Sequence, residues 1–130
     1  MHLFDRLPLG IFGPLTGANS RRAWDLICRL ANDLFGMDAA PPHPDGYLHE
    51  QVAKEIERFL LDQRWELEDG QMDATPLNIQ ANMLLRRLVD TGWLVEDTVG
   101  ARRFVNMRPV VARFFERLHQ FAEEDAELIG

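Results

Sequence analysis

The feature that most constrains the fold is a change of period within the stretch from Thr75 to Met107. Thr75 and Pro76 form a helix start signal, because threonine can cap free amides and proline needs no amide partner in the first turn. Apolar side chains then recur at helical spacing until Gly92, which suits the left-handed position at a helix end. These side chains are Leu77, Ala81, Leu84, Leu85 and Leu88. The sequence therefore predicts a helix with one apolar face.

Two short β-compatible runs follow this helix, Trp93–Glu96 and Arg102–Met107, and Asp97–Gly100 joins them. Such a pattern predicts a β-hairpin. A helix followed by a hairpin is the second half of a winged helix, and neither half can bury its apolar face alone. We therefore predict a mainly α fold, a winged helix-turn-helix of about four helices plus a β-hairpin wing, with an extended apolar N-terminal leader.

Three further helices complete the predicted domain. The first begins at Asn19 or Ser20 and runs to about Leu34 or Phe35. The second covers about 47–63, and the last begins at Pro109, which fits the first turn of a helix. Residues 64–74 are acidic and contain a glycine, so we expect a loop there, with room for a short extended piece at 65–67.

The predicted domain organisation has three parts. Residues 1–18 form the apolar leader, residues 19–122 the winged-helix domain, and residues 123–130 the start of a linker or a continuing helix of a longer protein. The leader lacks both helical and strand periodicity. Because it is too apolar to remain in water, it either folds back on its own core or covers a partner.

The charge of the chain is unevenly distributed. The formal net charge is −7, with −6 over residues 1–75, +3 over residues 76–119 and −4 over residues 120–130. Long-range attraction of the basic part to a polyanion is opposed by the rest of the chain. Non-specific binding of nucleic acid by this chain alone is therefore not favoured.

No catalytic, metal-binding or cofactor motif is complete. His49 and Glu50 begin like a zinc-protease motif, but Ala53 occupies the position of the required second histidine. Ser20 lacks the flanking glycines of a hydrolase elbow. The single cysteine, Cys28, lies in an apolar helical pattern that is typical of a buried thiol. We therefore expect a protein that is not an enzyme and that uses no cofactor or metal.

The sequence also predicts a cytoplasmic protein. No apolar run is long enough to span a bilayer. The first fifteen residues contain Asp5 and two prolines where a signal peptide would have a continuous apolar core.

Four arginines lie on the elements that a winged helix presents to DNA. Arg86 and Arg87 belong to the predicted helix, and Arg102 and Arg103 to the wing. The competing interpretation is a winged helix used for protein contact, in which the arginines pair with surface acids. We favour protein contact, because the exposed face of the helix is otherwise weakly charged.

The leader and the last helix carry more large apolar side chains than one small core can use. Surplus apolar surface of this kind favours a subunit contact. We predict a homodimer whose contact residues are Phe4, Leu7, Ile11 and Phe12 in the leader, with Val110, Phe114 and Phe121 on the last helix.

Several motifs occur together in a known order. These are LFDRLP at the start of the leader, the run Ala81–Leu88 leading into Thr91–Leu94, and FVNMRP before a phenylalanine-rich helix. In this combination, which covers nearly the whole chain, the sequence resembles the N-terminal region of the JetA-type kleisins of the Wadjet plasmid-defence system. These are similar in role to the MukF and MksF kleisins of bacterial condensins.

The resemblance implies a non-enzymatic scaffold in a bacterial SMC (condensin-like) complex. Its N-terminal winged-helix region would dimerise, and the full-length protein would bind the neck of the SMC ATPase subunit and a small winged-helix subunit of the KITE type. DNA would be reached only through the assembled complex, in the nucleoid or on plasmids, without a membrane. The alternative function is a winged-helix DNA-binding transcriptional regulator.

Overall fold

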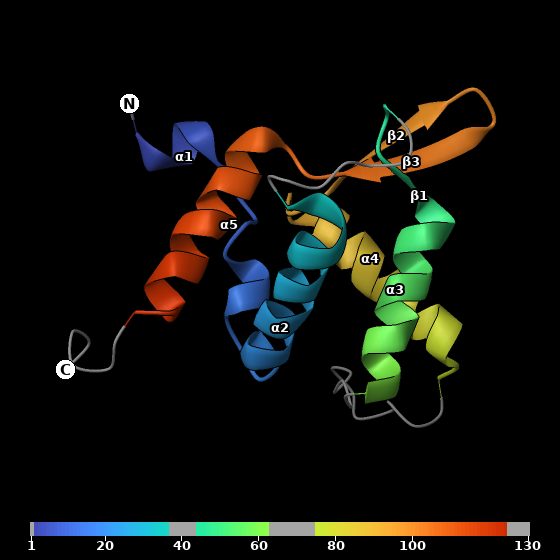
Figure 1. Cartoon of the computed structure of the whole chain (residues 1–130), viewed down its shortest axis with the longest axis horizontal. Helices are drawn as coiled ribbons and strands as arrows, with labels where there is room; N and C mark the ends of the chain where they lie inside the picture. The colour runs from blue at the N-terminus through green and yellow to red at the C-terminus, as the bar shows by residue number, and fades with distance from the viewer. Residues whose placement is uncertain (1, 37–43, 63–74, 125–130) are drawn as a thin grey trace.

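The computed structural model describes residues 2–36, 44–62 and 75–124. Over these residues the chain is mainly helical with a small three-stranded antiparallel sheet (Figure 1). This arrangement is compatible with the predicted helix-plus-hairpin fold. In chain order the elements are α1 (Leu3–Arg6), the 3-10 helix η1 (Gly13–Leu15), α2 (Ser20–Leu30), the π-helical turn η2 (Ala31–Phe35), β1 (Tyr47–Leu48), α3 (His49–Asp62), α4 (Leu77–Asp90), β2 (Val95–Val99), β3 (Arg102–Asn106) and α5 (Pro109–Ala122).

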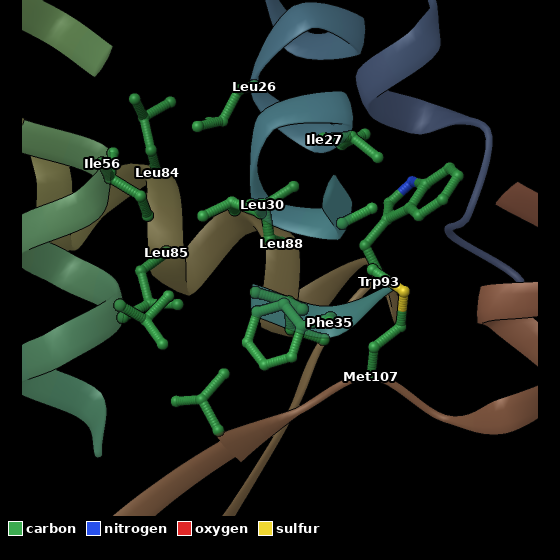
Figure 2. Close-up of a cluster of buried hydrophobic side chains, with 14 of the residues drawn as sticks. Leu26, Ile27, Leu30, Phe35, Ile56, Leu84, Leu85, Leu88, Trp93 and Met107 are labelled. Atoms are coloured by element: carbon green, nitrogen blue, oxygen red, sulfur yellow. The ribbon is translucent and has the colours of Figure 1, made fainter. Parts of the chain in front are cut away.

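The core forms where α2, α3 and α4 meet. Figure 2 shows Leu30 of α2 near the centre of a buried cluster, with Leu26 of the same helix at its upper edge. Ile56 of α3 lies on one side of them, and Leu84 and Leu88 of α4 complete the contact. Each such side chain contributes about 1.5–3 kcal/mol when it leaves water. In all three helices the apolar side chains that recur at helical spacing are therefore the ones that form the core.

The end of the first predicted helix lies where the sequence placed it, but its buried face differs. The chain leaves α2 through the π-helical turn η2 and ends the helical segment at Phe35. Leu34, which would continue the α-helical spacing of the buried Ala23, Ile27 and Leu30, is only half-buried, whereas Phe35 is buried. A π turn holds more residues than an α turn, so it rotates the buried position by one residue.

The third strand of the sheet comes from the start of the predicted second helix. Tyr47 pairs with Val105 and Leu48 with Phe104, so β1 lies beside β3, and α3 begins only at His49. The sheet order is β1-β3-β2. The extended piece predicted at 65–67 lies outside the described residues.

The hairpin has a tighter turn than the sequence predicted. Val99 pairs with Arg102, so the turn consists of Gly100 and Ala101 rather than of Asp97–Gly100. Gly100 has φ +64°, a conformation that two-residue hairpin turns use. Strand β2 therefore starts at Val95 and continues through the segment that was predicted as a loop.

Helix α4 ends as predicted and begins slightly late. Leu77 is its first residue, and the Pro76 carbonyl accepts hydrogen bonds from the amides of Ile79 and Gln80. At the other end Gly92 has φ +92°, the left-handed conformation that closes a helix. The predicted apolar face of α4 is confirmed, with Leu77 half-buried at its edge.

The leader folds back on the chain's own core, which decides between the two alternatives open from the sequence. It forms the short helices α1 and η1, neither of which the residue pattern predicted. The amide of Phe4 donates to the His2 ring and the amide of His2 to the Asp5 carboxylate, so local capping bonds hold α1. Figure 1 shows α1 beside the first turns of α5.

Candidate interaction surfaces

The leader is anchored at the junction between α4 and the hairpin. A Cβ added to Gly92 would overlap with the ring of Pro8, and a Cβ added to Gly10 would lie 3.1 Å from the Thr91 Cα. Both glycines therefore allow close backbone approach. The main-chain carbonyl of Ile11 accepts a hydrogen bond from the Trp93 indole. These contacts hold the leader against the end of α4.

A strip of aromatic side chains joins the leader to α5. Phe4 and Phe12 make an edge-to-face contact with ring centroids 6.5 Å apart, and Phe12 and Phe114 do so at 5.8 Å. Phe114 then lies 6.0 Å from the ring of Trp93. The strip runs from buried Trp93 to Phe4, which is 50% exposed. Pairs with this geometry contribute about 0.5–1.5 kcal/mol beyond the area that they bury.

The outer edge of this strip belongs to an apolar area that we call the leader–α5 surface. Phe121 follows Phe114 after two helical turns and is 61% exposed. Phe12, Val110 and Phe114 are half-buried and add to the apolar character of this edge. The members of the leader–α5 surface are Leu3, Phe4, Phe12, Val110, Phe114 and Phe121.

Two of the residues predicted for a subunit contact lie elsewhere. Leu7 and Ile11 are buried in the core of this chain. The prediction that Leu7 and Ile11 lie on a contact surface is therefore corrected. The leader turns both side chains inward, and their apolar area is covered within one molecule. Sequence reasoning left both arrangements of the leader open, and the leader's irregular spacing contains no signal that separates them.

The four arginines predicted for DNA contact are all exposed on α4 and the hairpin. Arg86 pairs with Asp90 at 3.8 Å, and Arg103 pairs with Glu96 at 3.5 Å. Exposed pairs of this kind are weak, about 0–1 kcal/mol. Both pairs agree with the interpretation in which arginines meet surface acids of the same chain.

A polar network that no sequence signal indicated lies between α3, α4 and the hairpin. His49 Nδ1 lies 2.8 Å from Glu96 Oε2, and His49 Nε2 lies 2.9 Å from Asn82 Oδ1. The Asn82 side-chain amide donates to the Asn78 carbonyl at 2.8 Å. We call His49, Asn82 and Glu96 the hairpin network. It connects three elements that are far apart in the sequence, so no local motif could reveal it.

The hairpin network limits what α4 can read on DNA. An asparagine that recognises adenine uses both atoms of its side-chain amide. In α4 both atoms of Asn82 already contact groups of this chain. The centre of the outer face is instead occupied by Ile79 and Met83, which are 48% and 51% exposed. This surface suits contact with protein better than contact with base edges.

A model of the family described as Wadjet protein JetA matches residues 43–130, about two thirds of the chain. The chain belongs to the JetA family. The match includes β1, α3, α4, the hairpin and α5, so both the hairpin network and the α5 part of the leader–α5 surface lie on family sequence. No curated protein and no solved structure matches the chain. Membership of the JetA family makes this protein a participant in the Wadjet defence complex.

Two of the ionisable groups of this JetA-family chain with a shifted pKa are Glu55, which is buried, and Cys28, which is half-buried and not fully buried as its sequence pattern suggested. Burial raises the pKa of the Glu55 carboxyl, but hydrogen bonds and charge attraction from Arg29 and Arg58 outweigh that effect and hold the pKa below its usual value. Burial, together with Asp25 and Glu123, raises the pKa of the Cys28 thiol to about 11. Cys28 is therefore a protonated thiol at neutral pH, unlike a catalytic cysteine.

In the part of the chain that the structure describes, none of the helices is both long enough and apolar enough to cross a membrane.

Proposed function

We propose that this chain is the non-catalytic dimerisation module of a kleisin-type subunit in a Wadjet SMC complex that acts against plasmid DNA. The JetA family match supports the Wadjet part of the proposal. The observation that carries dimerisation is the leader–α5 surface, where Phe4 and Phe121 remain about half exposed or more beside an ordered aromatic strip. Exposed aromatic side chains of this kind are typical anchors of protein interfaces.

The proposed architecture of the module is a winged helix. Helices α2, α3 and α4 are followed by the β2–β3 hairpin, and β1 adds a short strand between α2 and α3. This is the element order of a winged helix, with α4 in the place of the DNA-reading helix and the hairpin as the wing. Because Ile79 and Met83 occupy the centre of α4's outer face, we assign this winged helix to protein contact.

The proposed role is that of a scaffold. The Cys28 thiol is protonated at neutral pH, and both ring nitrogens of His49 contact side chains of the same chain. Cys28 therefore lacks the thiolate that a nucleophile needs, and the His49 ring is held in the hairpin network. ATP hydrolysis and DNA cleavage are assigned to partner subunits. The full-length protein would bind the SMC ATPase neck and a KITE-type subunit, and would reach DNA through the assembled complex in the cytoplasm.

The leader–α5 surface is suited to a two-fold contact. In a symmetric dimer the same patch appears on both subunits, so every exposed side chain is used twice. Full burial of one phenylalanine contributes about 1.5–3 kcal/mol. Phe4 and Phe121 from two subunits therefore supply a sizeable part of what a micromolar dimer needs, about 8 kcal/mol.

The test is the mass of the full chain in solution by light scattering at micromolar concentration. We expect twice the chain mass of 15.0 kDa. The double variant Phe4→Ser, Phe121→Ser should be monomeric while keeping its helical circular dichroism. Leu61→Ser is the control, because Leu61 lies on α3 outside this surface and is even more exposed than Phe4 and Phe121. A chain that is monomeric throughout, or a dimer that the double variant leaves intact, contradicts the proposal.

A further inference from the structure

Charged side chains border the phenylalanines of the leader–α5 surface. Arg117 lies three positions after Phe114 and four before Phe121. Arg113 lies one turn before Arg117. Side chains three and four positions apart are neighbours on a helix. Glu124 follows Phe121 by three positions, and its amide donates to the Phe121 carbonyl, so the helical turn continues to it. We call Arg113, Arg117 and Glu124 the α5 charge row.

The α5 charge row is exposed and unpaired in the part of the chain that the structure describes. No acidic side chain among the described residues pairs with Arg113 or Arg117, and no basic side chain pairs with Glu124. The neighbouring Glu123, by contrast, lies 3.9 Å from His119. The three charges of the row are therefore available to another molecule.

The order of charges along α5 does not suit an isolated helix. The N-terminus is the positive end of a helix dipole, so acids stabilise the first turn and bases the last turn. Helix α5 has no acid in its first turn and begins directly after the exposed Arg108. Its last turn has His119 as a base, but Glu123 and Glu124 follow its last residue. The charges thus give the helix a basic end and an acidic end, an order that favours contact with a second helix running the opposite way.

We propose that the α5 helices of two subunits lie antiparallel in the dimer, with the arginines of one charge row facing Glu124 of the partner subunit. A two-fold axis perpendicular to α5 reverses the direction of the second helix, so each basic end meets an acidic end. An axis near position 118 lies midway between Arg113 and Glu124, and also nearly midway between Phe114 and Phe121. A single arrangement therefore joins the opposite charges and the phenylalanines. It rests on the proposed dimerisation and adds the orientation of the two subunits.

The parallel orientation fits the same charges less well. It would place Arg117 beside Arg117 of the partner subunit, and Glu124 beside Glu124 of the partner subunit. Like charges that meet in an interface oppose association. Two copies of this chain, each with a formal net charge of −7, also repel one another at long range. Contact between the arginines and an acidic end offsets part of that repulsion. A nucleic acid fits the row less well than a second copy, because Glu124 would repel its phosphates.

The position of α5 leaves room for a second helix. Figure 1 shows α5 at the edge of the molecule, with α1 beside its first turns. The inner face of α5 buries Val111 and Phe115, and the Phe115 ring lies 5.4 Å from the ring of Trp24 on α2. The α5 charge row is exposed, whereas this inner face is not. A partner helix can therefore reach the row without any change in the core.

The experiment measures the dimer dissociation constant of the full chain by light scattering over a dilution series. The double reversal Arg113→Glu, Arg117→Glu should raise this constant about tenfold or more, because each substitution acts twice in a symmetric dimer. The charge-swap variant Arg113→Glu, Arg117→Glu, Glu124→Arg has the same row with its signs reversed. Two swapped helices that lie antiparallel again join opposite charges. The dissociation constant of the charge-swap variant should therefore return to within about threefold of the parent value.

A matched control changes the charge of the chain without touching this surface. Lys54→Glu, Arg102→Glu lowers the formal net charge by the same amount as the double reversal, at exposed residues of α3 and the hairpin. Its dissociation constant should stay close to that of the parent. Circular dichroism of every variant confirms the fold.

Two results would overturn the antiparallel arrangement while the proposed function stands. In the first, the parent dimerises and Phe4→Ser, Phe121→Ser separates it, but the double reversal has no effect. In the second, the charge-swap variant dimerises as weakly as the double reversal, which means that the two ends of the row do not meet. A parent chain that is monomeric contradicts both the proposed function and this arrangement.

Discussion

The indole N–H of Trp93 donates a hydrogen bond of 2.7 Å to the main-chain carbonyl of Ile11. The two residues are 82 positions apart in the sequence, and both are buried. A buried indole needs an acceptor and a buried carbonyl needs a donor, so each group satisfies the other. This bond makes the leader a part of the folded core.

Replacing Trp93 by phenylalanine should lower the free energy of unfolding by about 1–3 kcal/mol, because the Ile11 carbonyl stays buried without its donor. Urea denaturation measures this loss. Limited proteolysis should then cut the leader of the variant before the rest of the chain. Equal stability of variant and parent would show that water or another group replaces the indole.

Gly92→Ala should destabilise the chain more than Gly17→Ala. Both glycines have a positive φ, near +90°, which costs an alanine about 1–2 kcal/mol. A Cβ at Gly17 would meet no atom within 4 Å, whereas a Cβ at Gly92 would overlap with the Pro8 ring. The difference between the melting temperatures of the two variants measures the contribution of the contact between the leader and the end of α4. Equal melting temperatures would show that this contact adds no stability.

The sequence predicted the helices of the core because each buries a face with a clear period. Leu84 and Leu88 on α4 are buried, as the spacing indicates. The short pieces could not be found in this way. Strand β1 has only two residues and depends on pairing with β3, as Tyr47 does with Val105. The π-helical turn η2 places Phe35 in the core instead of Leu34. Neither feature leaves a repeat in the sequence.

The candidate surfaces were predicted less completely than the fold. The surplus of large apolar side chains in the leader and the last helix selected Phe121, which is 61% exposed, but it also selected Leu7 and Ile11, which are buried in the core. Whether an apolar leader covers its own core or another protein depends on tertiary contacts. The hairpin network joins His49 to Glu96, 47 positions away, and such long-range polar contacts leave no pattern in one sequence.

Cys28 should react slowly with iodoacetamide in the folded chain. Its pKa of about 11 leaves very little thiolate at neutral pH, whereas an unfolded thiol ionises near pH 8.5. We expect alkylation to accelerate on the order of 100-fold when urea unfolds the protein. Mass spectrometry of timed samples measures both rates. Rapid alkylation without urea would mean that the Cys28 thiol is ionised in the folded chain.

Glu55 joins two helices through charge-assisted hydrogen bonds. Its carboxylate lies 3.0 Å from Arg29 Nε on α2 and 2.9 Å from Arg58 Nη1 on α3, and the residue is buried. Glu55→Gln keeps the shape of the side chain and removes its charge. We expect the variant to lose about 1–3 kcal/mol of unfolding free energy at neutral pH, because hydrogen bonds between charged groups are stronger than neutral ones.

The loss should disappear in acid, and the direction of the pKa shift gives the sign. The pKa of the Glu55 carboxyl is lower in the folded chain than the usual value of a glutamate side chain, so folding favours the ionised form. Its contribution is complete above about pH 4.5 and is lost as the pH falls through the folded pKa. Urea denaturation near pH 7 and near pH 3 should therefore show the gap between parent and variant closing in acid. Glu50→Gln, at an exposed position on the same helix, should show a small gap at both pH values. A Glu55 gap that stays constant with pH would mean that shape, not charge, explains the effect.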